Sequence, residues 1–363
     1  MTPDPAAVAD NSIERMLIVR LGAMGDIIHT LPAVTGLRLA FPRAEIGWII
    51  EERWAELLCT LPTPRSGPCS PQRPLVDHVH TVNTQRWRKA KFASGTWEQI
   101  ASTLSDVRGR QYQVAVDLQG AVRSALLARW SGAPVIFGMR QPRETAAGMF
   151  YTRLVMPKGT HVVQQFLAVA EAVAATPLPI PTIQLPCDPS AEQACERMLS
   201  HLGITEFALL NPGAGWGAKQ WPAERYGAVA EQLSQSGLKS LINYGPGEES
   251  LARSVENSSG GTAKAITSSL PQLIAFTRRA HVFIGGDTGP MHLASALQIP
   301  VVGIFGPTNP ARNGPFGTKN TVLRSLSSPT DHSRRAEPDP GLLEITPEKV
   351  VAAVRQLLEQ FHV

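Results

Sequence analysis

The residues best suited to chemistry near the start of the chain form an acidic turn between a predicted strand and a predicted helix. The apolar run 16–21 leads into the small-residue turn 22–25, and Asp26 then opens a helical pattern. Such a turn puts Asp26 at the carboxyl edge of a parallel strand, where open α/β sheets bind ligands. The glycines are not spaced as G-x-G-x-x-G, so a dinucleotide site is not indicated. Two interpretations stay open: Asp26 acts on a substrate, or it only caps its helix.

Two loops of the second half join a strand end to glycines and a charged side chain. Loop 211–219 (NPGAGWGAK) exposes backbone N–H groups and ends in Lys219, a mobile cation suited to phosphate. The alternative interpretation is that this segment is only a long flexible loop between a strand and a helix. Loop 244–249 (YGPGEE) carries Glu248, which is placed either to bind ribose hydroxyls or to favour the dipole of the next helix.

Two further loops continue this pattern. Loop 285–292 (GGDTGPMH) runs from a strand into a helix start, whose backbone amides make an anion site. Asp287 is placed to cap that helix or to bind sugar hydroxyls, and His292 faces the same site or is a buried structural histidine. Loop 305–308 is another tight turn at a strand end. Four such loops in order favour a site for a nucleotide diphosphate.

The first half contains a basic stretch of a different kind. Between His78 and Trp97 there is no Asp or Glu, whereas Arg86, Arg88, Lys89 and Lys91 fall within six residues around Trp87. A charge run is usually a solvated face, but the missing acids favour an anion-binding surface. Nucleic acid is not expected, because the chain has no RNA- or DNA-binding motif and the stretch is short. A phosphorylated small molecule or a lipid head group fits better.

These residues need a scaffold, and length and composition indicate its class. At 363 residues, two domains are the natural expectation, and 43% hydrophobic with 18% charged residues is ordinary for a globular enzyme. The net charge of +4 suits an anionic partner. The sequence has no signal peptide, no C-x-x-C pair and no apolar run of spanning length, so we expect a cytoplasmic protein with reduced thiols.

Alternating strand and helix patterns predict an α/β fold with parallel sheets. Segment 176–189 has five prolines and is interpreted as the domain boundary. We expect strands at 16–21, 45–50, 113–116, 133–137, 207–211, 239–244, 281–284 and 301–305, and helices at 121–130, 160–175, 222–236, 248–257, 271–280, 291–297 and 346–361. The charged, proline-rich segment 324–341 is expected to be a surface loop.

Taken together, these segments resemble the family 9 glycosyltransferases of the bacterial heptosyltransferase group. The resemblance lies in GAMGDIIHTLPA (22–33), RWRKAKF (86–92), DLQGAVRSALLAR (117–129), KQWP (219–222), GDTGPMHLASAL (286–297) and GIFGPTNP (303–310). It implies a GT-B fold, with two Rossmann-like domains and a cleft between them. The implied organisation is a disordered tail 1–15, an acceptor-binding domain 16–178, a nucleotide-sugar-binding domain 179–345, and a final helix 346–363 that packs back on the first domain.

The same resemblance implies an activity. It is the inverting transfer of L-glycero-D-manno-heptose from ADP-heptose to a Kdo residue of Kdo2-lipid A in the lipopolysaccharide inner core. The donor is a substrate, and no cofactor or metal is implied. The acceptor implies reversible, salt-sensitive contact with the cytoplasmic face of the inner membrane. Two departures are the glycine-rich donor loop 211–219, where some relatives carry hydroxyl side chains, and the length and charge of segment 324–341.

The resemblance also implies roles for individual residues. Asp26 is the general base for the acceptor hydroxyl, Lys219 contacts the donor phosphates, and Glu248 contacts the donor ribose. The residues near the donor sugar are Asp287, Thr288, Gly289 and His292. The residues on the acceptor side are Arg86, Arg88, Lys89, Gln119 and Arg123.

Three alternatives remain. A related family 9 transferase, such as one resembling heptosyltransferase II, would use another acceptor or another nucleotide sugar. A sugar-nucleotide epimerase on the GT-B scaffold would have no use for the basic stretch 86–91. A non-catalytic nucleotide- or lipid-binding protein would have no use for Asp26 together with Lys219.

Overall fold

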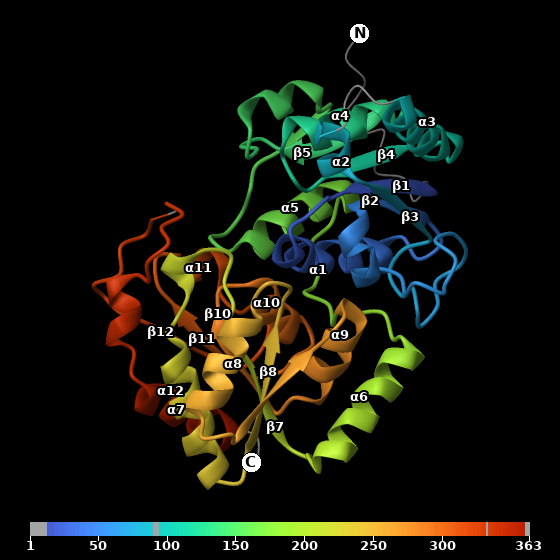
Figure 1. Cartoon of the computed structure of the whole chain (residues 1–363). Coiled ribbons are helices and arrows are strands. Elements are labelled where there is room, and N and C mark those ends of the chain that lie inside the picture. Colours follow the sequence, from blue (N-terminus) through green and yellow to red (C-terminus); the bar gives the residue numbers. More distant parts are fainter. Residues whose placement is uncertain (1–12, 90–93, 332, 360–363) are drawn as a thin grey trace. The chain divides into compact units, whose positions relative to one another are not determined.

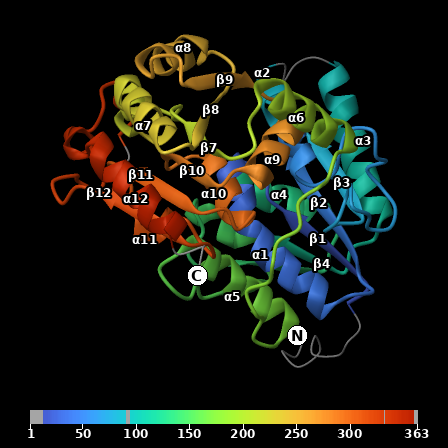
Figure 2. The same ribbon diagram turned by 90° about the horizontal axis from the view of Figure 1, so that it is seen from below.

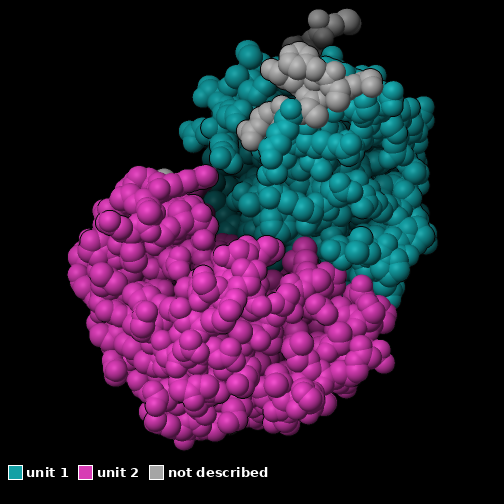
Figure 3. Space-filling view, in the orientation of Figure 1, with its two compact units in different colours: residues 1–187 teal, residues 188–363 magenta. Residues whose placement is uncertain are grey.

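The chain divides into two compact units in the computed structural model, residues 1–187 and residues 188–363 (Figure 3). The structure describes residues 13–89, 94–331 and 333–359, so the expected tail lies almost entirely outside the described residues. The division falls inside the proline-rich segment 176–189 but later than residue 178. The end of that segment is tied to the first unit, because the Cys187 backbone N–H donates to the Pro71 carbonyl oxygen at 2.9 Å.

The first unit is built on a six-stranded parallel sheet with helices on both faces (Figure 1). Its strands are β1 (Arg15–Val19), β2 (Glu45–Glu51), β3 (His78–Val82), β4 (Val114–Asp117), β5 (Val135–Met139) and β6 (Arg153–Val155). Its helices are α1 (Met24–Ala40), α2 (Thr84–Lys89), α3 (Ser94–Gly109), α4 (Val122–Trp130) and α5 (Val162–Ala174), with 3₁₀ turns η2 (Glu52–Leu57) and η3 (Thr145–Phe150).

The strand order β3-β2-β1-β4-β5-β6 makes this unit a doubly wound fold. Strand β1 pairs with β2 on one side and β4 on the other, with Val19 level with Asp117 of β4. The continuous apolar run of β1 reflects burial on both faces, since α1 packs with α5 while α4 covers the opposite side. The order of the strands reverses between β1 and β4, and open sheets bind ligands at such a switch point.

The second unit repeats the same plan, with a parallel sheet ordered β12-β11-β10-β7-β8-β9. Its strands are β7 (Phe207–Asn211), β8 (Lys239–Tyr244), β9 (Ala263–Thr267), β10 (Val282–Gly286), β11 (Val301–Phe305) and β12 (Asn320–Arg324). Its helices are α6 (Pro189–Leu202), α7 (Ala223–Gln235), α8 (Glu249–Ser258), α9 (Leu270–Arg279), α10 (Gly289–Ala296), α11 (Pro310–Asn313) and α12 (Pro347–Glu359), with 3₁₀ turns η4 (Gly217–Lys219) and η5 (Pro340–Glu344). Its switch point lies between β7 and β10.

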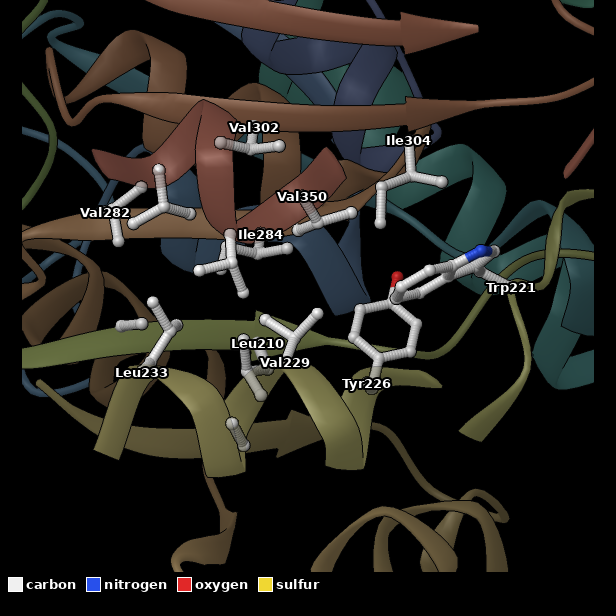
Figure 4. Packing of buried hydrophobic residues seen from close by; sticks show 14 of the residues in the cluster. Leu210, Trp221, Tyr226, Val229, Leu233, Val282, Ile284, Val302, Ile304 and Val350 are labelled. Atoms are coloured by element: carbon white, nitrogen blue, oxygen red, sulfur yellow. The ribbon is translucent and has the colours of Figure 1, made fainter. Parts of the chain in front are cut away.

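The core of the second unit lies between its sheet and the helices α7 and α12 (Figures 2 and 4). Trp221 and Tyr226 meet edge to face with ring centroids 4.9 Å apart, and the Trp221 indole N–H donates to the Ile345 carbonyl oxygen at 3.1 Å. Val350 and Val354 of α12 belong to this core. The apolar face of the final helix is therefore packed inside the second unit. No helix among the described residues has the length and apolarity to cross a bilayer.

Candidate active site

Asp26 lies in the first turn of α1, at the carboxyl edge of β1. Helix α1 begins at Met24, so Asp26 is its third residue, and its Oδ2 accepts a hydrogen bond from the Ala23 backbone N–H at 3.1 Å. Its Oδ1 is 3.1 Å from Nη2 of Arg20, whose side chain is only 7% exposed, whereas that of Asp26 is 45% exposed. The carboxylate therefore stabilises its helix and also presents a face to solvent.

Arg20 is the residue that holds this arrangement together, and the sequence reasoning missed it inside an apolar run. Its guanidinium donates to the Leu118 carbonyl oxygen and lies 5.1 Å from the centroid of the Phe166 ring. Burial lowers the pKa of Arg20, while the nearby Asp26 and Asp117 carboxylates oppose that shift. Arginine still stays protonated, because its ordinary pKa lies far above neutral pH.

Gln119 lies next to this cluster, after β4. Its side-chain oxygen accepts from the Leu21 backbone N–H at 2.8 Å, so the loops after β1 and β4 are joined at the switch point. Just before it, the buried Asp117 accepts hydrogen bonds from Ser124 Oγ at 2.9 Å and from the Tyr151 hydroxyl at 2.7 Å. Burial raises the pKa of Asp117 although these hydrogen bonds oppose the shift. Its Oδ1 also accepts from the Gln119 backbone N–H at 2.8 Å, so Asp117 shapes the loop that carries Gln119.

The remaining predicted acceptor residues lie at the same carboxyl edge. Arg123 Nη1 donates to Thr84 Oγ1 at 3.3 Å, and Thr84 in turn bonds the carboxylate of Glu51 at the end of β2. Arg86 and Lys89 are exposed on α2, which follows β3 directly. The basic stretch is thus helical over its first part rather than an open loop. Arg88 lies on the same helix, and Lys91 lies outside the described residues.

The strongest charged cluster of the second unit lies at its own switch point. Lys219, from the loop after β7, places Nζ 2.5 Å from Oδ2 of Asp287, which follows β10. His292 Nε2, in the second turn of α10, is 3.2 Å from Oδ1 of the same carboxylate. All three side chains are at most 10% exposed. Three residues predicted separately are therefore brought together, and Asp287 binds side chains rather than capping α10.

The electrostatics of this cluster keep Asp287 ionised. Burial by itself would raise the pKa of the Asp287 carboxyl, but the His292 and Lys219 interactions outweigh burial and hold that pKa well below its ordinary range. Lys219 also donates to the Asp287 carbonyl oxygen at 3.3 Å and lies 4.3 Å from the centroid of the Trp216 ring. Its ammonium is consequently fixed in direction, as a group that orients an anion must be.

Glu248 lies beside the same donor loop. It precedes α8, its Oε2 accepts from the Gly245 backbone N–H at 2.8 Å, and a Cβ at Gly213 would lie 2.3 Å from its carboxylate oxygens. The absence of a side chain at position 213 makes room for that carboxylate. Thr288 and Gly289 form the start of α10, directly after Asp287. All the predicted donor residues therefore lie in one unit, on neighbouring loops.

Comparisons with known proteins bear on the family of this chain. The family model for glycosyltransferase family 9 (heptosyltransferase) matches residues 100–340. Lipopolysaccharide heptosyltransferase 1 of Pseudomonas aeruginosa is 30% identical over 322 residues, which is 86% of this chain and 84% of that protein. The structure of E. coli heptosyltransferase WaaC with ADP-2-deoxy-2-fluoro heptose is 26% identical, with a TM-score of 0.70 over 96% of this chain and 99% of that one.

A third comparison concerns the fold. The family 9 glycosyltransferase of Veillonella parvula superposes with a TM-score of 0.81 over 96% of this chain and 98% of that one, at 22% identity. The two parallel six-stranded sheets of this chain thus match a fold that other family 9 enzymes share. On the strength of the family model and the P. aeruginosa relative, the chain belongs to glycosyltransferase family 9.

Proposed function

We propose that this enzyme transfers L-glycero-D-manno-heptose from ADP-heptose to a Kdo residue of Kdo2-lipid A, with inversion at the anomeric carbon. The observation that carries the proposal is the placement of a charged cluster at the switch point of each sheet. One holds the half-exposed Asp26 and the other holds the fixed Lys219. The similarity to heptosyltransferase 1 relatives supports the choice of donor and acceptor.

In the proposed reaction, an acceptor hydroxyl attacks the anomeric carbon of the heptose while the bond from that carbon to the diphosphate oxygen breaks. Asp26 accepts the hydroxyl proton as the new glycosidic bond forms. ADP leaves with the electron pair of the broken bond. Arg20 does not touch the reacting atoms in this scheme, but it holds one oxygen of Asp26 so that the other oxygen keeps a defined direction.

The leaving diphosphate gains negative charge, which preorganised donors stabilise. Lys219 has an N–H free for a phosphate oxygen after bonding the side chain and carbonyl of Asp287, because an ammonium has three donors. Backbone N–H groups at the start of α10 supply further donors. Glu248 binds a ribose hydroxyl of the donor in this proposal. In this proposal, Asp287, Thr288 and His292 lie near the heptose of the donor.

On the acceptor side, Gln119, Arg123 and the cations of α2 bind the phosphates and carboxylates of the Kdo-lipid A. The exposed Arg86 and Lys89 are suited to an anionic acceptor presented at a membrane surface. Contact with the membrane would then be reversible and weakened by salt.

The decisive experiment is mass spectrometry of the products made from ADP-heptose and Kdo2-lipid A. A single added heptose is expected, and Asp26→Asn should lower kcat by roughly 10²–10⁴-fold with ADP affinity unchanged. Asparagine is preferred to alanine because its amide oxygen can still accept from the buried Arg20. A heptose added only to an acceptor that already bears heptose, or an altered sugar nucleotide formed without acceptor, would overturn the proposal in favour of the alternatives.

A further inference from the structure

The charged segment that follows β12 packs against the donor loop. The Ala218 backbone N–H donates to the Arg335 carbonyl oxygen at 3.0 Å, and the Asp339 backbone N–H donates to the Ala218 carbonyl oxygen at 3.2 Å. A Cβ at Gly217 would lie 1.6 Å from the carbonyl oxygen of Ala336. Backbone therefore packs against backbone here, and residues 335–339 form one wall of the loop that carries Lys219.

Buried polar contacts fix the position of this segment. Asp339 is fully buried, and its Oδ1 accepts from Ser328 Oγ at 2.8 Å and from the Gly341 backbone N–H at 3.0 Å. Arg335 forms ion pairs within the segment itself, because its Nη2 is 3.6 Å from both Asp331 Oδ2 and Asp339 Oδ2. The segment thus has a defined place beside the donor loop.

Arg334 is the cation that this segment adds next to Lys219. Its guanidinium carbon lies 5.8 Å from the centroid of the Trp216 ring, the same ring that Lys219 Nζ approaches at 4.3 Å. The Arg334 side chain is exposed, and within the described part of the chain it forms no ion pair with a carboxylate. Arg334 therefore brings a positive charge to the same ring that Lys219 contacts, and that charge favours an anion bound nearby.

The charge balance of the cluster leads to the same conclusion. The ion pair at 2.5 Å with Asp287 largely neutralises Lys219. A diphosphate carries more than one negative charge, so the Lys219–Asp287 pair alone offers it little net attraction. An arginine supplies the missing charge and, with its planar fork of N–H donors, matches phosphate oxygens in geometry.

We infer that Arg334 is a further donor-binding residue, which contacts the diphosphate of the nucleotide and is positioned by Trp216. This inference rests on the proposed donor site at Lys219. It assigns a role to a residue of the charged segment 324–341, whose length and charge are a departure from the pattern that the resemblance implies. It also gives Trp216 a role, because its ring contacts both cations.

The test is isothermal titration calorimetry of ADP and of AMP with the full chain. Arg334→Ala should bind ADP about 3–10-fold more weakly, as expected for one exposed charged contact, and should also show a smaller salt dependence of ADP binding. The affinity for AMP, which lacks the second phosphate, should change less than twofold in this variant. Arg334→Lys keeps the positive charge, so its affinity for ADP should lie between those of the wild type and Arg334→Ala.

Arg197→Ala is the matched control, an exposed arginine on α6 on the flank of the second unit opposite β12 (Figures 1 and 2). It should bind ADP as the wild type does. If Arg334→Ala also binds ADP like the wild type, the inference is wrong while the donor site stands. If the wild type itself binds no ADP, both the proposed donor site and this inference are wrong.

Discussion

Replacing Asp287 by asparagine should destabilise the second unit more than replacing its partner Lys219 by methionine. The carboxylate is shared: Oδ2 lies 2.5 Å from Lys219 Nζ and Oδ1 lies 3.2 Å from His292 Nε2. Removing it leaves the buried lysine without its counter-ion. Removing the lysine instead leaves the carboxylate with His292 still in contact. The two substitutions therefore break the same contact with unequal consequences.

The expected magnitude follows from the distance and the burial. At 2.5 Å and an effective dielectric constant near 20, the Lys219–Asp287 attraction is about 7 kcal/mol, offset by several kcal/mol of lost hydration. Breaking such a buried pair from one side costs about 3–5 kcal/mol. We expect about 3 kcal/mol for Asp287→Asn, because Lys219 keeps the 287 carbonyl oxygen and the Trp216 ring. For Lys219→Met we expect about 1–2 kcal/mol, because the Asp287 carboxylate keeps its contact with His292.

Urea unfolding of the full chain, followed by circular dichroism, measures both changes in the free energy of unfolding. The double variant completes a mutant cycle, whose coupling energy should exceed about 1.5 kcal/mol. Glu231→Gln, an exposed carboxylate on α7, is the control and should change stability by less than about 0.5 kcal/mol. A coupling energy under about 0.5 kcal/mol would refute the pair as a stabilising contact.

The pH dependence gives a second check on the same reasoning. The folded pKa of Asp287 lies below its unfolded value of about 3.9, so its contribution to stability is present above that pH and is lost as the pH falls through the folded pKa. The stability difference between the wild type and Asp287→Asn should therefore shrink as the pH falls below about 4. A difference that grows as the pH falls below about 4 would contradict the assigned direction of the pKa shift.

Three further predictions concern other parts of the site. Arg20→Met should cost about 2–3 kcal/mol of stability in urea unfolding, because it leaves a buried carbonyl oxygen unbonded, and should lower kcat while ADP affinity stays unchanged. Gly213→Ala should weaken ADP binding in calorimetry, because the new Cβ would clash with the Glu248 carboxylate. Gly215→Ala is the control and should leave ADP binding unchanged, because no atom lies within 4 Å of its Cβ. Arg86→Ala should raise the acceptor KM and reduce the rise of that KM with salt; a KM indifferent to both would make α2 an ordinary solvated face.

The sequence predicts the buried strands most accurately. The bounds of β7, β8 and β11 agree with the expected ranges, because each is a short apolar run closed by a turn. The sequence reasoning missed β3, whose histidines break the apolar pattern. His80 is nevertheless buried, because Asp106 and Tyr112 bond its two ring nitrogens at 2.6 and 2.7 Å. Such distant partners are invisible in a local pattern.

Helix α6 was missed for a different reason. It begins at the end of the proline-rich segment that the sequence predicts to be the domain boundary, and half of its 14 residues are polar. Its signals were present all the same: the Asp188 side chain caps the helix by accepting from the Ser190 N–H at 2.9 Å, Pro189 is its first residue, and Gly203 ends it in a left-handed conformation. Proline at the first position of a helix starts it rather than breaking it.

The two switch points show why single residues could be predicted while their pairing could not. Asp26 and Asp287 were both found from strand ends and glycines, but each owes its properties to a cation that only the fold supplies. Arg20 and the Ala23 backbone N–H contact the two oxygens of Asp26, but its side chain is 45% exposed, so the carboxylate is accessible to a bound molecule. Asp287 is 7% exposed and bonds Lys219 and His292, so both of its oxygens are occupied. The first carboxylate is thus suited to accept a proton, whereas the second is suited to hold a cation in place.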